Sequence, residues 1–180
     1  MQIIIINGAP TCGKDSFVNL CQRYLLWCGN FSTVDFVKEV AATCGWDGTK
    51  TPKNRKFLSD LKDLLTEWND VPFKKIEQEI GSYEEQALSY DFSSKDVLCF
   101  VHCREPKEIA KFVDKLGAKT LLIRRPDVEG GDQSNHADSE VFNYDYDYTI
   151  TNDGTLLDLE RKAIDFLLEL GYKNLRPQKK

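Results

Sequence analysis

The sequence has no long hydrophobic run and no excess of positive charge. The longest continuous apolar stretch near the N-terminus is Ile3 to Ile6, which is too short for the core of a signal peptide or for a membrane span. The formal net charge is −5, and this argues against a dominant nucleic-acid partner, whose phosphates favour a basic surface. We therefore expect a soluble, cytoplasmic protein that binds neither membranes nor nucleic acids.

Histidines are few, and paired cysteine motifs are missing. The chain has two histidines and six cysteines, and no two cysteines form a CxxC pair. Cys99, His102 and Cys103 are close in sequence, but alternation along a strand would point His102 and Cys103 to opposite faces, which disfavours a zinc cluster. The cysteines fall among apolar positions, which indicates reduced thiols in the cytoplasm.

Short apolar runs alternate almost strictly with amphipathic segments, and no repeat or linker interrupts them. Residues 2–7 form a β-branched run typical of a strand that is buried on both faces. We predict four further strands, at 31–34, 97–101, 120–123 and 148–151. We predict helices at 13–28, 35–44, 52–68, 72–88, 106–117 and 156–170.

This alternation predicts an α/β fold in three layers, with a parallel sheet of about five strands between helices. With 180 residues, the chain is long enough for one domain with a complete core, and we expect a single domain over 1–180. Residues 45–92 are predicted to form a helical insert, and the polar residues 126–145 an irregular loop. Ligands of such folds bind at the carboxyl ends of the strands.

A phosphate-binding motif follows the first predicted strand. Gly8-Ala9-Pro10-Thr11-Cys12-Gly13-Lys14 fits the Walker A pattern GxxxxGK, and it lies between an apolar strand and an amphipathic helix, as that motif requires. The two glycines permit a tight turn whose backbone N–H groups face a phosphate, and the helix N-terminus adds its positive dipole end. The lysine supplies a charge that can follow the transferred phosphoryl group. We predict an ATP-binding P-loop at residues 8–16.

The two residues after the lysine extend this prediction to a metal ion. Asp15 stands where a serine or threonine is usual, and its carboxylate could hold Mg²⁺ directly or through a water. The alternative is that Asp15 only complements the helix dipole. Ser16 could hydrogen-bond an inner phosphate. Cys12 lies at the helix N-terminus, so we expect a lowered pKa for its thiol, without a catalytic role.

The segment GAPTCGKDS resembles the phage-type deoxynucleoside monophosphate kinases, in which an aspartate follows the P-loop lysine. Arg104-Glu105-Pro106-Lys107-Glu108 is similar to their Arg-x-Pro-x-Glu element, Arg125-Pro126 to their Arg-Pro pair, and 135–140 to their His-Ala-Ser-Glu segment with one residue added. Residues 148–156 resemble their final strand and turn. The match covers the first 20 residues and roughly 100–160.

The resemblance implies a P-loop kinase fold with a helical acceptor-binding insert and a short lid at 126–145. It also implies ATP and Mg²⁺ as donor and cofactor. One position departs from the pattern, because His102 stands where the family carries an aspartate of the magnesium and acceptor chemistry. Metal binding must therefore be rearranged or weaker, and Glu105 or Asp15 could substitute for that aspartate.

Two arginines join Lys14 as candidate catalytic residues. Arg104 follows the third predicted strand, where its guanidinium could bind the acceptor phosphate in bidentate geometry. The alternative is a surface salt bridge with Glu105 or Glu108. Arg125 could close over the transferred phosphoryl group. Strand alternation points Arg124 and Arg125 to opposite faces, so we expect only one of the two to act.

Two candidates for acceptor binding lie before and within the predicted helical insert. Asp35 is predicted either to contact the acceptor or to act as the N-cap of the helix that follows. Arg55 is predicted to reach the acceptor phosphate, and the alternative is an arginine on the surface.

The last candidates flank the nucleotide. His136 and Glu140 lie four residues apart in the predicted lid, and the alternative is that both are solvated loop residues. Asn152, Gly154 and Thr155 are predicted to contact the adenine edge, as the resemblance implies, and the alternative is a plain turn and helix cap.

These residues together predict transfer of the γ-phosphoryl group of ATP to a (deoxy)nucleoside monophosphate. One alternative is a kinase of another small phosphorylated metabolite, because the GKD variant also resembles the phosphomevalonate kinases of animals. Another is an ATP-binding regulator without catalysis, which His102 favours. A GTPase is disfavoured, since the sequence has no NKxD motif. The expected partners are small-molecule nucleotides, and the oligomeric state is left open, with a homodimer as one option.

Overall fold

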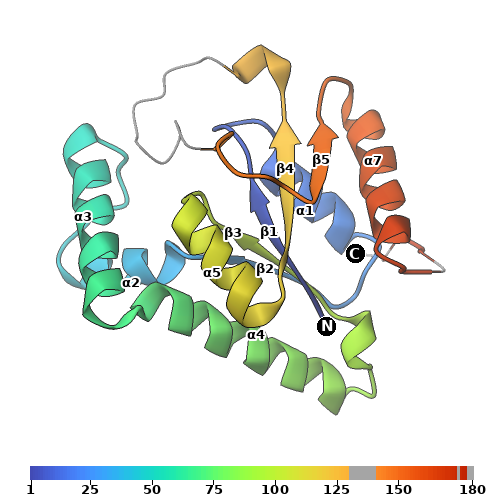
Figure 1. Cartoon of the computed structure of the whole chain (residues 1–180), viewed down its shortest axis with the longest axis horizontal. Coiled ribbons are helices and arrows are strands. Elements are labelled where there is room, and N and C mark those ends of the chain that lie inside the picture. The colour runs from blue at the N-terminus through green and yellow to red at the C-terminus, as the bar shows by residue number, and fades with distance from the viewer. Residues whose placement is uncertain (130–140, 174, 178–180) are drawn as a thin grey trace.

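A five-stranded parallel sheet forms the centre of the protein (Figure 1). The computed structural model describes residues 1–129, 141–173 and 175–177. The strand order is β2-β3-β1-β4-β5, and every neighbouring pair is parallel. The strands are β1 (Gln2–Asn7), β2 (Cys28–Ser32), β3 (Leu98–His102), β4 (Lys119–Arg124) and β5 (Tyr148–Thr151). The run of isoleucines in β1 occupies the central position because that strand is buried on both faces.

Helices cover both faces of the sheet, which confirms the predicted three-layer α/β fold (Figure 1). The helices are α1 (Lys14–Gln22), α2 (Asp35–Thr43), α3 (Pro52–Asn69), α4 (Val71–Ser89), α5 (Pro106–Leu116) and α7 (Leu156–Glu169). Two 3₁₀ turns are also present, η1 (Ser94–Asp96) and η2 (Pro126–Val128). The helical insert predicted at 45–92 contains α3 and α4.

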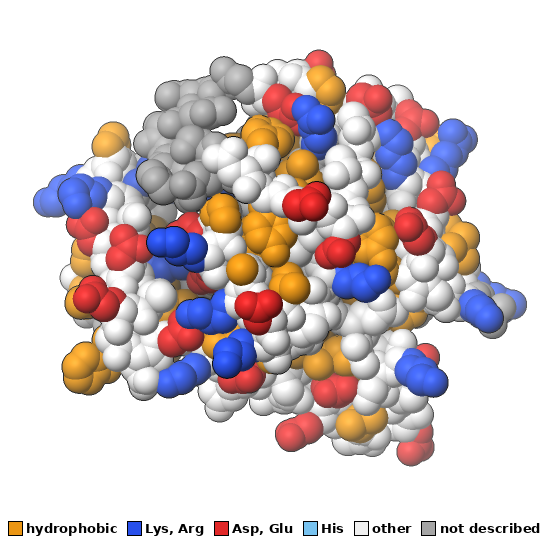
Figure 2. All heavy atoms as spheres, viewed as in Figure 1, with side chains coloured by type: hydrophobic (Ala, Val, Ile, Leu, Met, Phe, Trp, Pro, Cys, Tyr) orange, Lys and Arg blue, Asp and Glu red, His pale blue; other side chains and the backbone are white. Residues whose placement is uncertain are grey.

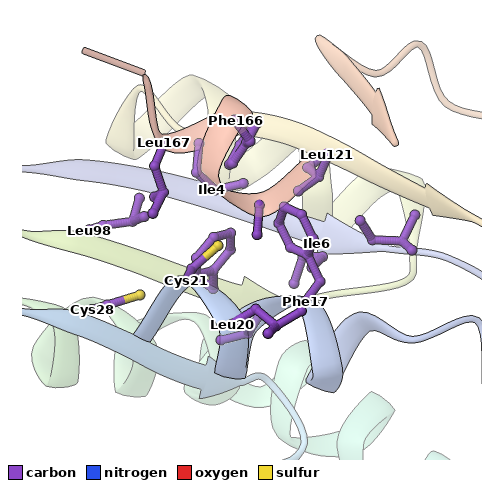
Figure 3. Close-up of a cluster of buried hydrophobic side chains, with 14 of the residues drawn as sticks. Ile4, Ile6, Phe17, Leu20, Cys21, Cys28, Leu98, Leu121, Phe166 and Leu167 are labelled. Carbon is purple, nitrogen blue, oxygen red and sulfur yellow. The ribbon is translucent and has the colours of Figure 1, made fainter. Parts of the chain in front are cut away.

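One hydrophobic core lies between the sheet and the helices α1 and α7. Ile4 and Ile6 of β1 point toward Phe17 of α1 and Phe166 of α7 (Figure 3). Phe17 packs edge-on against Phe166, with their ring centroids 5.6 Å apart. Phe17 is fully buried three residues after Lys14, so this packing holds the start of α1 directly beyond the end of β1.

A second hydrophobic core lies on the opposite face of the sheet. Ile3 and Ile5 of β1 alternate with the pair in the first core, and they pack with side chains of α4 and α5. Phe73 of α4 and Phe112 of α5 have ring centroids 4.9 Å apart. The helix α3 has no buried side chain, so it lies outside both cores and borders the site described below.

The helix predicted at 13–28 is wrong in its second half. The helix α1 ends at Gln22, and the chain turns so that β2 begins at Cys28 and pairs with Leu98 of β3. Tyr24 donates a hydrogen bond to Glu160 of α7 at 2.8 Å, which holds this turn. The second strand therefore starts three residues before the predicted Phe31, because sheet pairing overrides the helical spacing of the apolar residues.

The predicted N-cap at Asp35 is also wrong. Val34 is the N-cap of α2, and Asp35 is the first helical residue, without a capping hydrogen bond. Its carboxylate accepts a hydrogen bond from Lys38 Nζ at 2.8 Å. Asp35 still lies in the first turn, where a negative charge complements the helix dipole.

Acidic and basic side chains are interspersed on the face shown in Figure 2. Within the residues that the structure describes, none of the helices combines the length and the apolar character needed to cross a lipid bilayer.

Candidate functional site

The P-loop is a tight turn between β1 and α1 that requires both of its glycines. Gly8 has φ +149° and Gly13 has φ +103°. A Cβ atom on Gly8 would lie 2.3 Å from the carbonyl oxygen of Ile123, and one on Gly13 would lie 2.5 Å from Asn152 Nδ2. The backbone therefore approaches its neighbours more closely than any side chain would allow, as the Walker A pattern predicts.

Lys14 lies folded along its own loop. Its ammonium group donates hydrogen bonds to the carbonyl oxygens of Gly8 at 2.6 Å and Ala9 at 2.9 Å. Burial lowers the pKa of Lys14; the nearby Cys12 thiol opposes this shift, and the charge of Arg104 adds to it. The same donors can turn to phosphate oxygens, because an ammonium group carries three donors on a flexible stem.

Two buried asparagines support the loop. Asn7 accepts a hydrogen bond from the N–H of Gly8 at 2.8 Å, and its amide donates to the carbonyl oxygen of Arg104 at 3.2 Å. Asn152 donates to the carbonyl oxygen of Cys12 at 2.8 Å. Sequence analysis missed Asn7, although a polar residue that closes an apolar strand was a visible signal.

The prediction for the Cys12 thiol is wrong. Its side chain is fully buried, and burial raises the pKa of the thiol, although the charge of Lys14 opposes this shift. The sequence placed Cys12 correctly before a helix N-terminus, but it did not show that the side chain turns into the core.

A cleft of about 760 Å³ opens beside the P-loop, at the carboxyl ends of β1, β2 and β3. It brings together Pro10 and Thr11 of the P-loop and the other residues predicted from the sequence to act there, namely Lys14, Asp15, Asp35, Arg55, Arg104 and Glu105. Its basic lining residues are Lys14, Lys38, Lys50, Arg55, Lys62 and Arg104, and its acidic ones are Asp15, Asp35 and Glu105. Basic side chains therefore outnumber acidic ones here, in a chain whose net charge is −5, and such a cleft favours an anionic ligand.

Arg125 and the predicted adenine contacts are described residues that do not line this cleft. Arg125 is half-buried and precedes the turn η2, and Arg124 forms a forked ion pair with Glu129 at 2.6 and 3.1 Å. Thr155 caps α7, because its hydroxyl oxygen accepts a hydrogen bond from the N–H of Asp158 at 3.3 Å, and the hydroxyl donates to the Asp158 carboxylate at 2.6 Å. The predicted roles of Arg125, Gly154 and Thr155 stay predictions. The predicted lid residues His136 and Glu140 lie outside the described residues.

Lys62 is a cleft residue that sequence analysis did not select. Its ammonium group lies 2.7 Å from Glu108 and 3.2 Å from Glu105, and Cys103 also donates to Glu108, at 3.0 Å. Burial alone lowers the pKa of Lys62, but Glu108 and its neighbours outweigh burial and raise it. Lys62 lies seven residues after Arg55, on the same face of α3, and this helical spacing was a usable signal.

The residues that could hold a divalent cation lie beside the P-loop lysine. Asp15 has a side chain that is 87% exposed, and His102 Nε2 lies 3.7 Å from its carboxylate. His102 Nε2 is buried and has no hydrogen-bond partner in the part of the chain that the structure describes. Burial lowers the pKa of this imidazole against the opposing charge of Asp15. Among the described residues, no group of three or more His, Cys, Asp or Glu is placed to hold a metal. Asp15 and His102 therefore fit an ion whose remaining coordination positions are filled by phosphate oxygens and water.

No protein-family model matches the sequence, and no curated protein matches it either. Similar solved structures include shikimate kinase from Aquifex aeolicus vf5, with 11% identity over 95% of this chain and 100% of that chain, at a TM-score of 0.48. They also include dephospho-CoA kinase from Campylobacter jejuni, with 12% identity over 94% and 97% of the two chains and a TM-score of 0.46.

The APS kinase of Mycobacterium tuberculosis, in complex with AMPPNP and APS, is a third similar structure. Its identity is 15% over 93% of this chain and 97% of that chain, with a TM-score of 0.44. At these identities and scores, the likenesses carry no inference about activity. The chain's own geometry defines an α/β protein with a P-loop and a basic cleft at the carboxyl edge of a parallel sheet.

Proposed function

We propose that this protein is an ATP-dependent phosphotransferase that moves the γ-phosphoryl group of ATP to a (deoxy)nucleoside monophosphate. The observation that carries the proposal is the shared cleft, in which the P-loop lysine and a second set of basic side chains line one space. A P-loop suits the phosphates of a nucleoside triphosphate. The additional cations suit a second ligand that is itself a phosphate.

On the donor side, the loop and the N-terminus of α1 would hold the phosphates of ATP. Lys14 would exchange its carbonyl partners in Gly8 and Ala9 for phosphate oxygens. Mg²⁺, when bound with the nucleotide, would neutralise phosphate charge, with Asp15 as its oxygen donor. Asn7 and Asn152 would keep the loop rigid, so that little reorganisation is needed during transfer.

On the acceptor side, Arg104 and Arg55 line the same cleft as the donor loop. A guanidinium group matches the geometry of a phosphate monoester with two parallel hydrogen bonds. The acceptor phosphate is already an anionic nucleophile, so the reaction needs positioning and charge neutralisation more than a strong general base. Asp35 would contact the rest of the acceptor molecule.

The loop at 126–145 would close over the reactants, with Arg125 beside the transferred phosphoryl group. Closure would exclude water, which limits hydrolysis of ATP and strengthens the charge interactions inside. Asn152, Gly154 and Thr155 would contact the adenine from the end of β5. His136 and Glu140 would belong to this lid.

The second candidate function is a kinase of another small phosphorylated metabolite. The lining of the cleft favours it in one respect, because Phe31 is the one phenyl or indole ring among the described lining residues. A nucleobase gains binding energy by stacking on such rings. Because the cleft offers few of them, an acceptor without a base would lose little stacking energy there.

The experiment that separates the two candidates measures steady-state ADP release from ATP and Mg²⁺ with a panel of acceptors. The panel contains ribo- and deoxynucleoside monophosphates together with phosphorylated metabolites that carry no base. We expect stimulation by one or a few nucleoside monophosphates, and loss of that stimulation in Lys14→Ala. Stimulation only by acceptors without a base would replace the first candidate with the second.

A further inference from the structure

The contact between His102 and Asp15 is the feature of the cleft that the proposed reaction leaves unexplained. His102 is the last residue of β3, where it pairs with Ile6 of β1 and Ser32 of β2. Its ring is therefore held by the middle of the sheet and lines the cleft at the carboxyl edge. The Nε2 atom is buried, yet no hydrogen-bond partner among the described residues satisfies it. A buried polar atom without a partner is costly, and a bound ion that accepts its lone pair would remove that cost.

The distance between the two side chains suits two ligands of one metal ion. His102 Nε2 lies 3.7 Å from Asp15 Oδ1, which is too long for a hydrogen bond. Divalent metals bind imidazole nitrogen and carboxylate oxygen at about 2.0–2.2 Å. Two such bonds that meet at an angle between about 90° and 120° separate the donor atoms by roughly 3.0–3.8 Å. The observed spacing of 3.7 Å falls within that range.

We propose that His102 Nε2 and the Asp15 carboxylate are the two protein ligands of a divalent cation that arrives with the nucleotide, and that this cation is Mn²⁺ or Co²⁺ in preference to Mg²⁺. The inference rests on the proposed function, since phosphate oxygens and water complete the coordination. Imidazole nitrogen binds Co²⁺, and to a smaller extent Mn²⁺, in preference to Mg²⁺, for which carboxylate and water suffice. A nitrogen ligand therefore shifts the preference of the site away from Mg²⁺.

The charges around His102 explain why the cation needs the nucleotide. Lys14 and Arg104 act on the imidazole with positive charge, and Asp15 and Asp35 act on it with negative charge. Basic side chains outnumber acidic ones in the lining of the cleft, so the protein alone does not attract a cation there. Bound triphosphate would add the missing negative charge beside Lys14. We expect weak Mn²⁺ binding to the protein alone and tight binding in the presence of a nucleotide.

The direct test detects the histidine nitrogen on the metal. Protein labelled with ¹⁵N at histidine only is mixed with Mn²⁺ and AMP-PCP, an ATP analogue that cannot transfer its γ-phosphoryl group, and ¹⁵N coupling to Mn²⁺ is measured by pulsed electron paramagnetic resonance. The chain has two histidines, so His136→Gln is a matched control for His102→Gln. Binding of a fluorescent ATP analogue shows that each variant is folded.

We expect a ¹⁵N coupling in the wild type and in His136→Gln, and its loss in His102→Gln, with nucleotide binding retained. We also expect His102→Asp to lower the ratio of Mn²⁺ to Mg²⁺ affinity on the order of 10-fold, because both ligands are then oxygens. Wild-type protein that binds Mn²⁺ and AMP-PCP without any ¹⁵N coupling, or that loses it in His136→Gln, would overturn this inference alone. Protein that binds no nucleotide would overturn the proposed function as well.

Discussion

Asn152 shows how a single side chain can set the shape of the P-loop from a distant part of the sequence. Its amide donates a buried hydrogen bond to the carbonyl oxygen of Cys12, 140 residues away in the chain. The same amide nitrogen occupies the space that a side chain on Gly13 would need. The loop and Asn152 therefore form one packed unit, which joins the donor site to the end of β5.

Replacing Asn152 with alanine should destabilise the protein by about 1–3 kcal/mol, because the buried carbonyl oxygen of Cys12 loses its donor. ATP affinity should fall in the same variant, since the loop is no longer held. Chemical denaturation and calorimetric titration with ATP measure the two effects. Asn143→Ala removes an exposed asparagine and serves as control. A variant with unchanged stability and affinity would show that the loop does not depend on Asn152.

At the residue scale, residues within a local motif could be predicted from the sequence. Side-chain directions and partners that depend on burial could not. The position of Lys14 and the tight turn at Gly8 and Gly13 follow from the spacing of the Walker A pattern. The pKa shift of Cys12 had the wrong sign, because the direction of its side chain depends on packing between β1 and α1. Asn7 and Lys62 were missed because their partners come from distant segments, at Arg104 and at Glu105 and Glu108.

At the scale of the elements, a charge bridge joins α3 to the rest of the fold. This helix has no buried side chain, and Lys62 joins it to the start of α5 through Glu105 and Glu108. The side chains of Lys62 and Glu108 are 14% and 11% exposed. Removing only one partner of an ion pair with so little exposure is costly, because the other charge is left without a partner. The wall of the cleft that carries Arg55 should therefore depend on this bridge.

Lys62→Met should lower the free energy of unfolding by about 3 kcal/mol, because Glu108 is left with an unpaired charge of low exposure. Lys56→Met is the matched control on the same helix. Lys56 pairs with Asp60 at 2.6 Å, but both side chains are exposed, so its loss should cost less than about 1 kcal/mol. Urea denaturation of both variants measures the difference, and equal costs would contradict a structural role for the Lys62 bridge.

The elements were predictable where local pattern and tertiary packing agree. The strand β5 has the predicted bounds, and α3 and α5 differ from their predicted bounds by about one residue. The segment from Arg23 to Trp27 was predicted as helix, because Tyr24 and Leu25 continue the apolar spacing and pack against the same core. The β2 strand was displaced because Gly29 and Asn30 are residue types depleted in strands.

At the scale of the whole molecule, charge is distributed unevenly. The chain has a net charge of −5, yet six basic side chains line one cleft at the carboxyl edge of the sheet. The surrounding negative charge repels anions elsewhere, while the walls of the cleft concentrate the positive potential. The fold class could be predicted from the alternation of strands and helices, but the complete lining of this cleft could not, because it is built by four separate segments of the chain.

The central claim is that the cleft transfers a phosphoryl group, and the fate of the γ-phosphoryl group tests it most directly. ATP radiolabelled at that group is incubated with the protein and each nucleoside monophosphate, and the products are separated by chromatography. The account predicts label in the corresponding nucleoside diphosphate, and its loss in Lys14→Ala. Label that stays in ATP with every acceptor, while the protein still binds ATP, would contradict the account and favour an ATP-binding regulator.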